Sequence, residues 1–124
     1  MSEIRATTIS NAAGTGPATL TGQSAAKAWV NFNATTTLTI RNSLNTSSVT
    51  DNGVGNYHPN FANAFIDAGY CQSAFGHHYG GVSLSTSSSS SDETTSGFSV
   101  FSYTCSGTLY DNEYFSVSIH GDLA

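Results

Sequence analysis

The segment from residue 27 to residue 33 contains the only tryptophan of the chain and constrains the fold more than any other stretch. Its sequence, Lys-Ala-Trp-Val-Asn-Phe-Asn, follows the period-two pattern of a β-strand. Alternation places Trp29 and Asn31 on one face and Val30 and Phe32 on the other, so both faces carry a large apolar side chain. We therefore expect a central strand of a sheet, with Trp29 as an aromatic anchor of the core.

The remaining sequence contains further short β-prone runs that are separated by turn residues. They are 37–41, 47–50, 57–61, 69–76, 82–86, 98–105 and 114–119. In the first of these, Leu38 and Ile40 alternate with threonines and should face inward. We expect one helical turn at 24–28 and a polar turn at 42–45. Eight or so strands with frequent turns predict an all-β fold, an antiparallel β-sandwich or jelly-roll-like domain.

The strongest hairpin signal is Asp51-Asn52-Gly53, which lies between two β-prone runs. The second of these runs contains Pro59, which has no backbone N–H to donate to a neighbouring strand. We therefore expect this strand to lie at the edge of its sheet or to contain a bulge.

Charged residues make up only 9% of the 124 residues, against roughly 25% in ordinary soluble proteins. Serine, threonine, asparagine and glycine take their place, which favours strands with Thr and Ser at the outward positions. Such a composition is typical of all-β proteins on extracellular or virion surfaces. The chain length predicts a single domain.

The first 23 residues contain few apolar side chains and make a poor independent core. We expect residues 1–23 to form an extended N-terminal docking arm and residues 24–124 to form the sandwich. Docking on a neighbouring subunit would use Ile4, Arg5, Ile9 and Leu20. The Gly14-Thr15-Gly16 sequence is not followed by the lysine of a phosphate-binding loop.

The formal net charge of −5, with Arg5, Lys27 and Arg41 as the fixed cations, argues against nucleic acid as a partner. No run of 18 apolar residues predicts a membrane span, so we expect no membrane partner. The N-terminus lacks the layout of a secretory signal, which favours synthesis in a cytoplasm.

Cys71 and Cys105 each lie in an apolar and aromatic segment, without the spacing of a zinc site. We expect two buried thiols, since a disulfide is rare in a chain made in a reducing compartment. A bridge remains open if their two strands are neighbours.

The sequence contains no clear catalytic pattern, and we expect no enzymatic activity. There is no Gly-x-Ser-x-Gly elbow, and most acidic residues lie in predicted turns. His77 and His78 are adjacent, so on a strand they point to opposite faces and chelate poorly. A metal would require three copies of one histidine at a trimer axis. We therefore expect no metal or other cofactor.

Two exposed segments are candidates for contact with a partner. The first contains His77, His78 and Tyr79, and the second is the Ser/Thr-rich run 87–96 with Asp92 and Glu93. The second segment lacks the apolar surface that would offset its ordering entropy, so we expect a mobile loop. Aromatic side chains near the first segment could stack on sugar rings.

Several motifs together resemble those of a family of virion-surface proteins from tailed bacteriophages. The most specific are Lys-Ala-Trp-Val-Asn-Phe at 27–32 and Thr-Asp-Asn-Gly at 50–53. The other matching segments are 1–5, 8–11, 14–17, 20–21, 67–70, 111–114, 116–117 and 121–122, with Phe61. The resemblance therefore spans almost the whole chain.

Members of this family are labelled tail fibre or head decoration proteins. The resemblance implies a β-rich, non-enzymatic protein on the virion surface, with the chain itself as partner in a homotrimer. At 124 residues the chain fits a capsid decoration or cement protein bound to the major capsid protein or other virion proteins. The alternative is a short tail fibre or receptor-binding protein that contacts host surface glycans.

Overall fold

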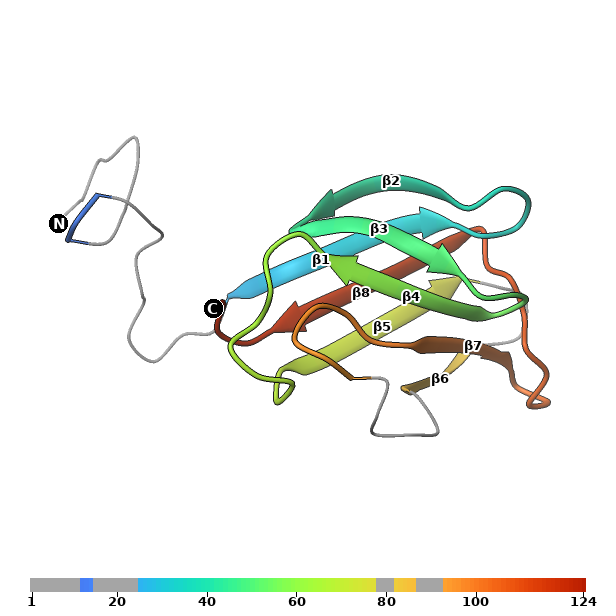
Figure 1. Ribbon diagram of the computed structural model, residues 1–124. Helices are drawn as coiled ribbons and strands as arrows, with labels where there is room; N and C mark the ends of the chain where they lie inside the picture. Colours follow the sequence, from blue (N-terminus) through green and yellow to red (C-terminus); the bar gives the residue numbers. More distant parts are fainter. Residues whose placement is uncertain (1–11, 15–24, 78–81, 87–92) are drawn as a thin grey trace, which may run out of the picture.

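The computed structural model describes residues 12–14, 25–77, 82–86 and 93–124. This part of the chain forms eight β-strands (Figure 1). They are β1 (Ala26–Asn33), β2 (Thr39–Leu44), β3 (Thr46–Asp51), β4 (Asn56–Phe61), β5 (Cys71–His77), β6 (Val82–Thr86), β7 (Val100–Thr104) and β8 (Tyr114–His120).

The strands form two four-stranded antiparallel sheets that pack face to face (Figure 1). The first has the order β2-β1-β8-β5 and the second has the order β3-β4-β7-β6. The first strand, β1, pairs with the last strand, β8, and in the opposite sheet β4 pairs with β7. Two packed antiparallel sheets of this kind make the fold a β-sandwich. This arrangement confirms the predicted all-β fold and the central position of β1.

Alternation in the central strands supplies the core between the two sheets. Ala28, Val30 and Phe32 of β1 are at most 1% exposed, and Phe115, Val117 and Ile119 of β8 are at most 2% exposed. β1 and β8 pair directly, so these six side chains form a continuous apolar layer. Leu38 and Ile40 pack against the core as predicted.

Aromatic rings form two clusters in the core, and the first of these connects the two sheets. Phe32 and Phe115 of the first sheet contact Tyr57 of the second, with ring centroids 5.1 to 5.4 Å apart. A second cluster contains the rings of Phe61, Phe65, Tyr70 and Phe98. Edge-to-face and tilted pairs of this kind each add about 0.5–1.5 kcal/mol beyond the burial of their area.

The predicted hairpin joins β3 to β4. The carboxylate of Asp51 accepts a 2.9 Å hydrogen bond from the N–H of Gly53, as expected for an Asx turn. Gly53 and Gly55 have φ angles of 117° and 63°, which favour glycine. A Cβ at Gly55 would also lie 2.6 Å from the carbonyl oxygen of Ser102. The turn therefore needs glycine for both conformation and space.

Three local predictions have different outcomes. For the strand with Pro59 we expect an edge position or a bulge, and its pairing with β3 has a register shift between Thr46 and Ser48, next to the Val49–Pro59 pair. β4 is nevertheless an inner strand, so the edge position is wrong, and its pairing with β7 covers only Asn56 and Tyr57. The missing N–H of Pro59 therefore costs no bond to β7. The expected helical turn at 24–28 is also wrong over Ala26–Ala28, which belong to β1 and pair with β8. The predicted turn at 42–45 is reduced to Asn45, because β2 extends to Leu44.

The two cysteines are exposed and do not form a disulfide, so the prediction of buried thiols is wrong. Cys71 starts β5 at a position that faces away from the core, and Cys105 follows β7 in the turn toward Gly107. Cys71 is exposed because alternation turns it outward, and Cys105 is exposed because it lies in a turn beyond the end of its strand.

The two ends of the sandwich differ. At one end, Ala26 pairs with His120, and Phe65 forms a β-bridge with Leu123. The point at which residues 1–24 join the sandwich therefore lies beside the C-terminus (Figure 1). The other end contains the β3–β4 hairpin and the loop that leads into β8.

Candidate binding face on the first sheet

The outer face of the first sheet is formed by side chains that alternation turns away from the core. In β1 these are Trp29, Asn31 and Asn33, because the intervening residues are buried. The register places Trp29 beside Ser118 of β8, which in turn lies beside Ser73 of β5. The outer face is therefore ordered in rows that run across the strands.

The prediction that Trp29 anchors the core is wrong. Trp29 is half-buried on the outer face, whereas its neighbours Ala28 and Val30 are buried between the sheets. Alternation correctly separates the two faces of this strand but does not identify the one that meets the second sheet. That choice is made by Tyr57, whose ring contacts Phe32.

The next row across the sheet contains Asn31, Ser116 and Phe75. Phe75 is 72% exposed, the highest value among the large apolar side chains that the structure describes. Trp29 and Phe75 are separated by β8, which places their strands about 10 Å apart, since adjacent strands are about 4.8 Å apart. The two aromatic side chains therefore stand on either side of the short side chains of β8.

A shallow, open groove of about 580 Å³ follows these two rows. Two hydrogen bonds order the polar groups of the groove. Asn31 donates from Nδ2 to Oγ of Ser116 at 2.6 Å, and the hydroxyls of Ser73 and Ser118 lie 2.8 Å apart. Small side chains along the centre and aromatic side chains at the flanks give the groove its shape.

The groove continues toward the end of the face where β8 begins. A second hollow of about 360 Å³ is lined by Asn31, Phe75, His77, Tyr114 and Ser116. The rings of His77 and Tyr114 are perpendicular, with centroids 6.3 Å apart. His77, a predicted partner contact, is therefore at the rim of this face.

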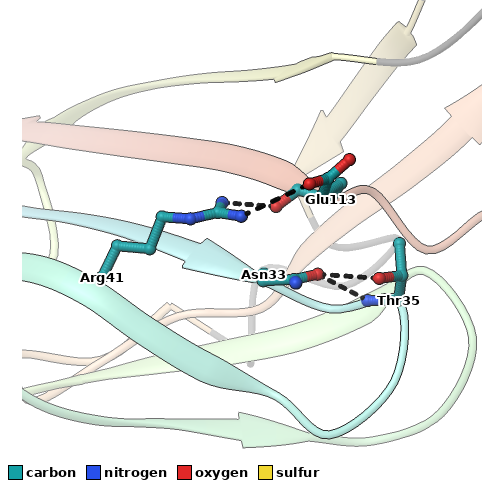
Figure 2. A network of polar contacts seen from close by, with 4 residues as sticks. All are labelled: Asn33, Thr35, Arg41 and Glu113. Carbon is teal, nitrogen blue, oxygen red and sulfur yellow. Dashed lines mark hydrogen bonds and ion pairs between the residues drawn. The ribbon is translucent and has the colours of Figure 1, made fainter.

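Arg41 closes this end of the face. A register shift between Asn31 and Phe32 in the β1–β2 pairing gives β2 an extra residue at Arg41. The guanidinium of Arg41 lies 3.8 Å from the centre of the Tyr114 ring. It also donates a hydrogen bond to the carbonyl oxygen of Glu113 and lies 3.9 Å from Oε1 of the same residue (Figure 2). The charge of Arg41 is thus largely engaged within the protein.

The loop that follows β1 is fixed by a side chain of the same face. Oδ1 of Asn33 accepts hydrogen bonds from the backbone N–H and the hydroxyl of Thr35, both at 2.9 Å (Figure 2). The last outward position of β1 therefore stabilises the turn toward β2, and the residues of this strand that line the groove are Trp29, Val30 and Asn31.

A separate polar cluster lies between the sheets at the hairpin end. Asp111 accepts hydrogen bonds from the hydroxyl of Tyr57 and the N–H of Gly55, and the buried Asn112 donates to Ser102. Burial, together with the hydrogen bond to Asp111 and its charge, raises the pKa of Tyr57 well above its usual value. These contacts join loops to strands, and we interpret the cluster as structural.

The other predicted contact residues are not brought together. Glu93 is half-buried and accepts a 2.6 Å hydrogen bond from Nε2 of Gln72, on the core side of β5, whereas His77 is on the outer side. The N–H of Thr94 donates a 2.9 Å hydrogen bond to the carbonyl oxygen of Gly97, and the two residues form a β-bridge. The end of the predicted mobile loop therefore forms an ordered turn. The remaining predicted contact residues are not among those that the structure describes. They are Ile4, Arg5, Ile9, Leu20, His78, Tyr79 and Asp92. The run 87–92 is not described either.

Sequence reasoning missed Phe75, Asn31 and the serines of β8 as members of one face. The available signal was the alternation of Ser116 and Ser118 with buried Val117, and of Ser73 and Phe75 with Ala74. The pairing of β8 with both β1 and β5, which unites these residues, is not visible in the sequence.

The fold and this face define an antiparallel β-sandwich with an aromatic and polar outer sheet face. Comparisons with models of protein families, with curated proteins and with solved structures found no match. Within the described ranges, no group of three or more His, Cys, Asp or Glu residues is placed to hold a metal ion. The same ranges contain no helix long and apolar enough to cross a membrane.

Proposed function

We propose that the chain is a non-enzymatic structural protein of a phage virion, which decorates the head as a homotrimer. The observation that carries the proposal is that the N-terminal segment and the C-terminus meet the sandwich at the same end, away from the β3–β4 hairpin. Residues 1–24 join at the end where Ala26 pairs with His120, beside the C-terminus. An arm attached there can dock on the shell while the rest of the sandwich stays accessible.

In this arrangement the arm provides the anchor. Ile4, Ile9 and Leu20 supply apolar contacts and Arg5 a charge contact with the major capsid protein or with another subunit. A protein that binds only the assembled shell stabilises it by mass action. The homotrimer follows from the resemblance of the segments 27–32 and 50–53 to virion-surface proteins.

Labelling of intact particles tests the location. An antibody against the sandwich, bound to purified particles and viewed by electron microscopy, should label the head. Labelling confined to the tail would contradict the decoration function.

Removal of the arm tests the anchor. A variant without residues 1–23 should retain the circular dichroism spectrum of the sandwich but should not bind particles that lack the protein. The full-length variant Ile4→Asp/Ile9→Asp should behave in the same way. Binding that is equal to that of the unchanged chain would show that the arm is not the anchor.

A second candidate function is that of a short tail fibre or receptor-binding protein that contacts host glycans. The groove between Trp29 and Phe75 favours it, because exposed aromatic side chains beside hydroxyl and amide groups suit a sugar. Tail labelling, together with blocking of adsorption by the free protein, would favour this function over head decoration.

A further inference from the structure

We infer that the groove on the outer face of the first sheet binds an uncharged saccharide, with Trp29 and Phe75 stacking on sugar rings. The inference goes beyond head decoration and requires only that this face stays uncovered in the particle. Binding can be measured on the isolated chain, so its failure would leave the location on the virion undecided. In the same way, labelling of the tail would leave the binding result intact.

The aromatic side chains provide the first argument. Phe75 is 72% exposed on a paired strand, and Trp29 lines the same groove from the other side of β8. A sugar ring presents a face of C–H groups that packs on the face of an aromatic ring. Stacking of this kind would cover apolar surface that the fold leaves in contact with water.

The polar groups between these side chains provide the second argument. The hydrogen bond from Asn31 to Ser116 uses one N–H of the amide, which leaves a second N–H and a carbonyl oxygen. The hydroxyls of Ser73 and Ser118 are bonded to each other, and each has further capacity as donor or acceptor. These groups can meet the hydroxyls of a sugar whose ring is stacked beside them.

The charge of the groove determines the ligand class. None of the residues that line the 580 Å³ groove is ionisable, and the hollow that continues it adds only His77 and Tyr114. The nearby cation of Arg41 is engaged by the Tyr114 ring and by Glu113. A phosphorylated, sulfated or sialylated sugar would therefore find no fixed positive charge among the residues that line the groove, and an uncharged saccharide fits better.

The groove is also preformed. Trp29 and Asn31 lie in the inner strand β1, which is paired on both sides, and the serines of β8 lie in the other inner strand. Binding would therefore cost little ordering of the backbone. Because β8 separates the two aromatic side chains, the geometry suits a short oligosaccharide lying across the strands rather than one sugar ring.

The composition of the face argues against a second copy of the chain as its occupant. Protein interfaces are depleted in serine and alanine, and the groove contains Ser73, Ala74, Ser116 and Ser118. Covering these hydroxyls with protein would require a matching set of polar partners. A sugar provides such partners through its own hydroxyls.

Because Trp29 is the only tryptophan, its fluorescence reports directly on the groove. We would titrate the full chain with uncharged hexasaccharides of glucose, mannose and N-acetylglucosamine, and with sialylated and sulfated oligosaccharides for comparison. At least one uncharged oligosaccharide should shift the emission with saturation. Phe75→Ala should weaken its affinity about tenfold, the effect of about 1.4 kcal/mol from one lost stacking contact.

Ile66→Ala is the matched control, since Ile66 is 65% exposed but lies outside the groove. It should leave the affinity unchanged, and Trp29→Phe should retain part of it when binding is followed by amide NMR shifts. No response to any uncharged oligosaccharide at millimolar concentration would overturn the inference. So would equal weakening by Phe75→Ala and Ile66→Ala, binding of the charged oligosaccharides alone, or a stable oligomer in which Trp29 is buried.

Discussion

The hydroxyl of Tyr57 donates a 2.7 Å hydrogen bond to Oδ1 of Asp111, which is 54 residues further along the chain. The same oxygen accepts a 2.8 Å hydrogen bond from the N–H of Gly55. The bond joins β4 of the second sheet to the loop that leads into β8 of the first. It therefore fixes the two sheets to each other at the end opposite Ala26 and the C-terminus.

Loss of this hydrogen bond should destabilise the sandwich. Tyr57→Phe keeps the ring contacts with Phe32 and Phe115 but leaves Asp111 with one donor fewer, which should lower the free energy of unfolding by about 1–3 kcal/mol. Tyr114→Phe, at a half-exposed ring, should change it by less than about 0.5 kcal/mol. Urea unfolding measures both, and equal effects would contradict the structural role of the bond.

The core and the outer face should respond differently to truncation. Phe32→Ala removes a fully buried ring and should cost about 3–5 kcal/mol. Trp29→Ala removes a larger but half-buried side chain, and its cost should be smaller, about 1–2 kcal/mol. If denaturant unfolding gave Trp29→Ala the larger effect, Trp29 would be a core residue after all.

Gly55 should tolerate substitution much less well than Gly107. Both have positive φ angles, 63° and 80°, so Ala strains the backbone at either position. At Gly55 the added Cβ would also lie 2.6 Å from Ser102 O and 2.7 Å from Tyr110 N, whereas at Gly107 it would meet nothing within 4 Å. Gly107→Ala should cost about 1–2 kcal/mol and Gly55→Ala clearly more. Similar melting temperatures for the two variants would contradict this close approach.

The protein should lose stability at alkaline pH. Burial, and then the charge of Glu93, raises the pKa of Tyr70 to about 12. The folded state thus keeps a proton that the unfolded chain releases near pH 10. The stabilisation is complete below pH 10 and is lost as the pH rises through 12.

Tyr70→Phe removes this titration, so the unfolding free energy of the variant should fall less steeply between pH 10 and 12. The variant also loses the hydrogen bonds from the hydroxyl to Thr94 and Gly97, and it should therefore be less stable at neutral pH. Urea unfolding at several pH values separates the two effects. A pH dependence parallel to that of the unchanged chain would exclude Tyr70 as a source of the alkaline loss.

The sequence predicts the fold class because alternation and turn residues are local signals. The segment 27–33 and the Asp-Asn-Gly turn are examples, and both are found where they are expected. The position of Trp29 could not be predicted in this way. Which face of β1 is buried depends on Tyr57 and Phe115, which are distant in sequence and meet Phe32 only after the sheets form.

The binding face is non-local for the same reason. Asn31 and Ser116 are 85 residues apart and lie side by side because β1 pairs with β8. The sequence of one strand shows which residues alternate and which of them are polar. The order of the strands in the sheet, however, decides which residues of different strands share a face. Phe75 looks like a core residue in its own segment and proves to be exposed.

A cryo-electron microscopy reconstruction of the intact particle tests most directly whether the chain is anchored at one end with its outer sheet face displayed. We predict three copies around a threefold axis on the head, with Ala25 toward the shell and the groove beside Trp29 and Phe75 open to solvent. Density for the sandwich in the tail alone, or a head-bound sandwich with this sheet face against the shell, would contradict the proposal.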